Sequence, residues 1–234
     1  MSKIECRDRL IVALDVPDAA AARALVERIG DGACFYKIGL ELFTSGSYFE
    51  LLSWLTARGN KVFADLKLYD IPETVRRAVA NLGGRGASFL TVHGHRSVME
   101  AAAREKGAMK ILAVTVLTSF DQRDLEEMGA RTTVEELVLA RAKAAAETGC
   151  DGVIASGLEA GPLKAHFKER LLVVTPGIRP MQNRPADDQK RAVDVATAFA
   201  NGADYIVVGR PIRDAQDPRA AAHGIQQTIA SVFK

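Results

Sequence analysis

Short apolar runs alternate with stretches of helical periodicity from one end of the chain to the other. Eight runs have the length and composition of buried strands, and they cover residues 10–14, 34–38, 62–64, 87–92, 110–117, 152–155, 171–174 and 205–208. Apolar residues at helical spacing predict helices over residues 19–29, 47–57, 72–82, 98–105, 132–149, 158–166 and 193–201, and a last helix ending at 233. This alternation of strand and helix predicts an α/β fold, a parallel (β/α)8 TIM barrel.

The main alternative is a doubly wound open sheet, which also alternates strands with helices. The end of the first predicted strand, at Asp15, lacks the Gly-rich turn of a dinucleotide-binding fold. No linker and no change of composition divides the chain. We therefore predict a single TIM-barrel domain over residues 1–234.

Three local signals mark where predicted helices begin. Asp18 precedes the first helix and suits an N-cap. Pro72 pre-sets the first turn of the third helix. Thr132 and Glu135 have the spacing of a capping box for the helix that runs to Gly149.

Composition narrows the class of protein. The 31 basic and 29 acidic residues are spread along the chain and leave a net charge of +2, which argues against a nucleic-acid partner. No apolar stretch approaches the roughly 18 residues that cross a bilayer, so no membrane partner is expected. The start lacks the apolar core of a secretory signal. Three cysteines without metal spacing fit reduced thiols, and together these features predict a cytoplasmic protein.

The candidate chemistry is concentrated in residues 61–74, which read KVFADLKLYDIPET. Asp65 and Lys67 follow a buried run, and residues two apart on a strand project to the same side. Asp70 falls in the loop before Pro72, where the next helix begins. Charged groups at the end of a buried strand are costly unless they are paired or used.

Charged and polar residues recur at the carboxyl ends of the other predicted strands, which is where TIM barrels place their active sites. These residues are Asp15, Lys37, His93, Thr118, the Pro176-Gly177 turn with Arg179, and Gly209-Arg210.

Each of these residues has an ordinary structural explanation. Asp65 and Lys67 could form an ion pair inside the barrel, and Lys37 could pair with Asp15. Asp70 could serve the helix terminus, and we expect His93 to be a polar residue below the site rather than a catalyst. The convergence of Lys37, Asp65, Lys67 and Asp70 is harder to explain as packing. Alternating charges keep each other ionised and would keep a lysine protonated as a proton donor.

The ends of the last two strands predict a phosphate site. Barrels often bind phosphate through the loops after strands seven and eight, and here these loops supply Gly177, Gly209 and Arg210. The alternative is that the glycines are turn residues and the arginine is a surface side chain. The polar stretch 180–189 has the length of a lid. No metal-binding, Gly-x-Ser-x-Gly, Walker or dinucleotide signature is present, although Asp15 and Asp65 could hold Mg²⁺.

The segment DLKLYDIPETV resembles the Asp-x-Lys-x-x-Asp-Ile-Pro-x-Thr signature of orotidine 5′-phosphate decarboxylases. Further segments resemble the bacterial form of that family in order and spacing, so the resemblance spans nearly the whole chain. They are IVALD, FYKIG around Lys37, AVTVLTS ending at Ser119, VTPGIRP and YIVVGRPI.

The resemblance implies a homodimer that converts orotidine 5′-monophosphate (OMP) to uridine 5′-monophosphate (UMP) and CO₂ in de novo pyrimidine biosynthesis, without metal or organic cofactor. It implies that Lys37, Asp65 and Lys67 form the catalytic array with Lys67 as proton donor, and that Asp70 reaches into the partner's site. The implied substrate contacts are Asp15 and Thr74 at the ribose, Thr118 and Ser119 at the pyrimidine, and Arg179, Gln189, Gly209 and Arg210, with Gln189 and Arg210 at the phosphate.

Two alternatives stay open. A related sugar-phosphate lyase, of the 3-keto-gulonate phosphate decarboxylase or hexulose phosphate synthase type, resembles this pattern but uses Mg²⁺. The Ile71-Pro72 step and the 177–180 turn favour the pyrimidine enzyme. A non-catalytic nucleotide-binding barrel would bind UMP without turnover, and the intact Lys67 with its flanking acids argues against it.

Overall fold

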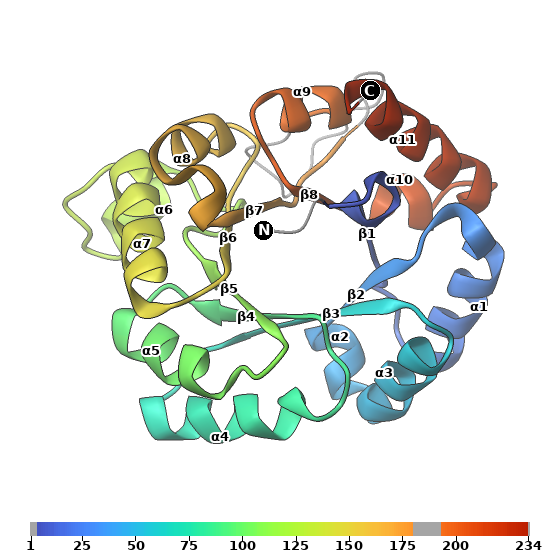
Figure 1. Cartoon of the computed structure of the whole chain (residues 1–234), viewed down its shortest axis with the longest axis horizontal. Helices are drawn as coiled ribbons and strands as arrows, with labels where there is room; N and C mark the ends of the chain where they lie inside the picture. Colours follow the sequence, from blue (N-terminus) through green and yellow to red (C-terminus); the bar gives the residue numbers. More distant parts are fainter. Residues whose placement is uncertain (1–3, 180–192, 234) are drawn as a thin grey trace.

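Eight parallel strands close into a barrel in chain order, with helices around the outside (Figure 1). The computed structural model describes residues 4–179 and 193–233. The strands are β1 Leu10–Ala13, β2 Phe35–Gly39, β3 Lys61–Leu68, β4 Phe89–His93, β5 Lys110–Val114, β6 Gly152–Ile154, β7 Leu172–Thr175 and β8 Tyr205–Val208. β1 pairs with both β2 and β8, which closes the sheet. The predicted (β/α)8 TIM barrel is confirmed.

The helices alternate with the strands as the apolar periodicity predicts. They are α1 Ala19–Ile29, α2 Leu40–Thr44, α3 Tyr48–Ala57, α4 Pro72–Gly83, α5 Arg96–Glu105, α6 Gln122–Glu127, α7 Val134–Thr148, α8 Ala160–Phe167, α9 Val195–Ala200, α10 Arg210–Arg213 and α11 Pro218–Val232. The sequence did not predict α2, α6 or α10. Of these, α2 and α10 span only five and four residues, too few turns to show a period.

The helix starts are set by side-chain caps. Asp18 Oδ1 accepts a hydrogen bond of 2.8 Å from the Ala21 N–H, as predicted. The predicted capping box at Thr132 and Glu135 was wrong by one residue: the box is formed by Thr133 and Glu136. Paired threonines and paired glutamates allow both registers in the sequence. Only the later one begins the helix at Val134, which is buried.

The interior of the barrel is filled by aromatic side chains at its amino-terminal half. The Phe89 ring lies 5.0 Å from Phe35, 5.1 Å from Tyr205 and 6.0 Å from Phe63, in edge-to-face arrangements. Such pairs contribute beyond the area that they bury. A packed layer therefore closes the barrel below its carboxyl-terminal end.

Along β1, β2 and β3, a buried apolar residue of the barrel interior is followed two positions later by a charged residue. Ala13, Phe35 and Phe63 belong to the inner core, and the residues two positions later are Asp15, Lys37 and Asp65. Since side chains two apart share a face, the column that is apolar at the bottom of the barrel becomes charged at the top.

We expect Phe89→Ala to lower the free energy of unfolding by about 3–5 kcal/mol, because it removes the ring at the centre of the aromatic layer. Urea unfolding followed by circular dichroism measures the change. Leu139→Ala is the control: this leucine is 41% exposed, so its replacement should change stability by at most about 0.5 kcal/mol. Equal losses in the two variants would contradict a core role for the layer.

Candidate active site

A cavity of about 490 Å³ opens at the carboxyl-terminal ends of the strands. It gathers most of the site residues that the sequence predicts. Those that line it are Asp15, Lys37, Asp65, Lys67, Thr118, Ser119, Gly177, Arg179, Gly209 and Arg210. They come from β1, β2, β3, the loop after β5 and the ends of β7 and β8, so the barrel brings together residues spread over nearly 200 positions of sequence.

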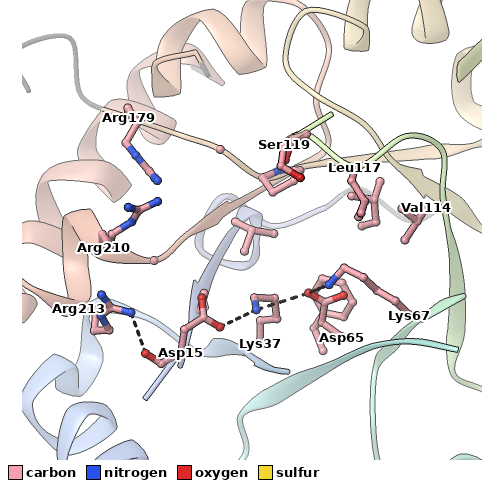
Figure 2. Close-up of a pocket in the computed structure, with 18 residues that line it drawn as sticks. Asp15, Lys37, Asp65, Lys67, Val114, Leu117, Ser119, Arg179, Arg210 and Arg213 are labelled. Atoms are coloured by element: carbon pink, nitrogen blue, oxygen red, sulfur yellow. Dashed lines mark hydrogen bonds and ion pairs between the residues drawn. The ribbon is translucent and has the colours of Figure 1, made fainter. Parts of the chain in front are cut away.

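Four charged side chains form a row along one wall of the cavity (Figure 2). Lys37 Nζ lies 2.9 Å from Asp15 Oδ1 and 3.5 Å from Asp65 Oδ2. Lys67 Nζ lies 2.9 Å from the same Asp65 oxygen. The row therefore reads Asp15, Lys37, Asp65, Lys67, with signs that alternate. The ion pairs weighed as packing alternatives do form, but they form on the wall of an open cavity.

Asp65 is the most buried member of the row, at 8% exposure. Burial would raise its pKa, but the ammonium groups of Lys37 and Lys67 outweigh burial and hold the pKa below its ordinary value. Burial would likewise lower the pKa of Lys37, and the carboxylates of Asp65 and Asp15 raise it instead. Both groups are therefore ionised at neutral pH.

Three guanidinium groups gather at the other end of the cavity (Figure 2). Arg179 and Arg210 were predicted from the sequence. Arg213 was not: it lies one helical turn after Arg210 on α10, and no motif marks it. Its Nη1 donates a hydrogen bond of 2.8 Å to the backbone oxygen of Asp15, and its Nε lies 2.6 Å from Asp214 Oδ1. The cavity thus combines a cationic end with a row of mixed charge.

The turn after β7 needs its glycine. Gly177 has a φ of 75°, in the left-handed region that L side chains rarely adopt. The turn carries Pro176 and Gly177 into the lining of the cavity. It also leads to Arg179, whose Nη1 donates to the backbone oxygen of Ile178 over 2.9 Å.

Two predicted site residues do not line the cavity of their own chain. Asp70 is exposed, and its Oδ1 accepts a hydrogen bond of 2.6 Å from the Ile71 N–H. Thr74 is exposed in the first turn of α4. A third predicted residue, Gln189, and the predicted lid 180–189 lie outside the described residues.

His93 lies at the end of β4 but does not line the cavity. Its ring centroid is 5.0 Å from that of Tyr69. Burial lowers its pKa, and the charges of Arg141 and Lys67 lower it further. This histidine is therefore neutral at pH 7, and the expectation that it is not a catalyst stays a prediction.

Within residues 4–179 and 193–233, no group of three or more His, Cys, Asp or Glu side chains is arranged to hold a metal ion. Cys6, Cys34 and Cys150 are free thiols. No helix in the same ranges combines the length and the apolar character needed to cross a membrane.

A family model described as orotidine 5′-phosphate decarboxylase / HUMPS family matches residues 8–225. The chain belongs to this family. It is 60% identical to the orotidine 5′-phosphate decarboxylase of Methylococcus capsulatus over 98% of this chain and 95% of that protein. It is 53% identical to the one of Stenotrophomonas maltophilia over 97% of this chain and 94% of that protein. The crystal structure of orotidine 5′-phosphate decarboxylase from Lactobacillus acidophilus matches with a TM-score of 0.83 and 35% identity, covering 95% of this chain and 99% of that one.

These matches confirm the family resemblance found in the motifs. The similarity also includes segments in which the sequence analysis found no motif, since the family match and the two relatives each cover more than nine tenths of the chain. The roles of individual residues stay predictions.

The depressed pKa of Asp65 predicts how stability depends on pH. In the unfolded chain an aspartate takes up its proton near pH 3.9, whereas folded Asp65 stays ionised at that pH. Its contribution is therefore complete above about pH 4 and is lost as pH falls through the folded pKa. As pH falls from 5 to about 2, we expect the free energy of unfolding to decrease more for wild type than for Asp65→Asn, because only wild type loses the ionised carboxylate.

Urea unfolding of both proteins over that range measures this difference. The other carboxylates are common to the two proteins, so they cancel. Parallel curves would contradict a depressed pKa at Asp65.

Proposed function

We propose that this chain catalyses the decarboxylation of OMP to UMP and CO₂ in de novo pyrimidine biosynthesis. The observation that carries the proposal is the row Asp15–Lys37–Asp65–Lys67, which shares one cavity with the arginine cluster. Membership of the orotidine 5′-phosphate decarboxylase / HUMPS family supports the same conclusion.

The charges of the cavity fit the two ends of this substrate. The phosphate binds at the arginine end, where Arg210 and Arg179 offer charge-assisted hydrogen bonds and Gly209 leaves the backbone accessible. The pyrimidine lies toward Lys67, beside Thr118 and Ser119. Asp15, at the opposite end of the row from Lys67, and Lys37 beside it bind the ribose.

The reaction creates a charge that the ring cannot absorb. When the bond from C6 to the carboxylate breaks, its electron pair stays at C6 in the plane of the ring, outside the π system. The Lys67 ammonium stabilises this charge and then gives it a proton, which forms UMP and leaves a neutral amine for solvent to reprotonate. Asp65 orients Lys67, because its carboxylate lies between the two ammonium groups and pairs with both.

The whole chain, residues 1–234, acts as one catalytic domain in the cytoplasm. The reaction uses neither a metal nor an organic cofactor, because the ammonium of Lys67 supplies both the positive charge and the proton. Gln189 grips the phosphate together with Arg210.

The first experiment follows the loss of OMP absorbance in buffer with EDTA, for wild type and for Lys67→Ala. We expect wild type to turn over and the variant to lose at least about 10²–10⁴-fold in kcat, since it lacks the proton donor. Circular dichroism checks that the variant is folded. Absence of turnover by folded wild type, with EDTA or with added Mg²⁺, would overturn the proposal.

Turnover of a keto-sugar phosphate with Mg²⁺ in that case would identify the related lyase. Tight UMP binding without any turnover would instead identify a non-catalytic nucleotide-binding barrel.

The active form in this proposal is a homodimer in which Asp70 completes the partner's site. Asp70 and Thr74 are exposed and stand outside their own cavity. Two large apolar side chains flank Asp70, and both are exposed: Tyr69 at 59% and Ile71 at 67%. An exposed apolar loop that carries a charged residue suits a protein interface.

Mixing Asp70→Ala with Lys67→Ala tests the shared site. In a heterodimer both changes fall in one site and the other site is intact, so random exchange should restore up to about a quarter of wild-type activity. Asp65→Asn mixed with Lys67→Ala is the matched control. Each substitution inactivates the site of its own chain, so this heterodimer has no intact site and should show no rescue. No rescue in the first mixture, with subunit exchange confirmed, would count against a shared site.

A further inference from the structure

Strand β3 contains a bulge where it carries the catalytic pair. Its pairing with β4 is regular up to Ala64, which faces Leu90, and resumes at Leu68, which faces Val92. Three β3 residues, 65–67, therefore stand opposite a single β4 residue, Thr91. Bulges of this kind re-aim side chains next to active sites.

The bulge forces Lys67 into an unusual conformation. Its φ is 47°, in the left-handed region, where only two non-glycine residues of the described chain are found. This conformation is disfavoured for a residue with a side chain and persists only when its surroundings hold it. The direction of the Lys67 side chain depends on whatever fixes the backbone here.

The Thr91 hydroxyl makes two hydrogen bonds inside the bulge. Its Oγ1 lies 3.0 Å from the Lys67 backbone N and 2.8 Å from Asp65 Oδ1. Thr91 is fully buried, with no exposed surface, so no water competes for these contacts. One oxygen atom thus joins the backbone of one charged residue to the carboxylate of the other.

The chemistry of the groups fixes the direction of both bonds. A backbone N–H can only donate, so the hydroxyl accepts from Lys67. Its one proton is then available to the ionised carboxylate of Asp65. With Oδ1 engaged by Thr91 and Oδ2 by the two lysines, both oxygens of Asp65 are held. The carboxylate cannot rotate without breaking one of these contacts.

We propose that Thr91 is a positioning residue for the decarboxylation, because its single hydroxyl holds the left-handed backbone of Lys67 and the carboxylate of Asp65 in register. This inference rests on the proposed function. Thr91 touches neither the cavity nor the reacting atoms. It acts through the two residues that do.

The test separates the hydroxyl from the packing of the same side chain. Thr91→Val keeps the size and branching and removes the hydroxyl, whereas Thr91→Ser keeps the hydroxyl and removes a methyl group. We expect Thr91→Val to lose on the order of 10²-fold in kcat, the effect of a small misplacement of catalytic groups. The KM for OMP should change less than about threefold, because the phosphate end is untouched. Thr91→Ser should keep kcat within about threefold of wild type.

The matched control is Thr115→Val. Thr115 is also fully buried, and its hydroxyl donates to the backbone oxygen of Ile154 over 2.8 Å, away from the charged row. Its kcat should stay within about threefold of wild type. An equal loss of kcat in Thr91→Val, Thr91→Ser and Thr115→Val would indicate a general effect on folding and would overturn the positioning role. So would a Thr91→Val enzyme with wild-type kcat.

A crystal structure of Thr91→Val keeps this outcome separate from the proposed function. We expect Lys67 Nζ and Asp65 Oδ2, now 2.9 Å apart, to separate beyond 4 Å, or the Lys67 backbone to leave the left-handed region. An unchanged bulge would overturn the inference whatever the activity of wild type. If wild type proved inactive toward OMP while the variant's bulge rearranged, the proposed function would fail, and Thr91 would still position the charged row.

Discussion

The active site depends on one buried carboxylate. Asp65 is held ionised between two ammonium groups, and its carboxylate is the counter-ion that these two groups share. Removing any member of such an array leaves its neighbours with uncompensated charge. This constraint accounts for the alternation of sign along the row from Asp15 to Lys67.

The barrel meets this constraint by changing the character of its interior along the strands. Aromatic rings fill the lower part, and the next inward positions on β1, β2 and β3 carry charge. The rigid lower layer limits movement of the strands that hold the row. The cationic end is built differently, from the short helix α10 and the turn at Gly177, where the chain departs from regular structure. The cavity thus combines the charged row, which strands position, with the arginine cluster, which a short helix and a turn position.

The sequence predicts the barrel and most of the cavity because both depend on short-range patterns. The spacing of Asp65 and Lys67 predicts that they project together, and they do form an ion pair, although the bulge in β3 interrupts the regular strand there. A strand end predicts the position of Lys37. Thr91 is hidden, because a threonine within an apolar run looks like an ordinary strand residue. Its role appears only when the bulge in β3 sets it opposite the catalytic pair. Arg213 was not predicted for a similar reason: the backbone oxygen of Asp15, to which it donates, lies at the end of another strand. Asp70 was predicted from the charge pattern and Thr74 from the family resemblance, and one chain alone does not bring them to the cavity.

The aromatic layer has a consequence for molecular traffic. Phe35, Phe63, Phe89 and Tyr205 fill the interior below the charged row, so the barrel has no through passage there. Among the described residues, molecules therefore enter and leave the cavity on the carboxyl-terminal side of the strands. CO₂ and UMP, the products of OMP decarboxylation, share that side of the barrel as their way out. The floor of the barrel thus constrains the route of product release, although its aromatic side chains carry no charge and only Phe63 among them lines the cavity.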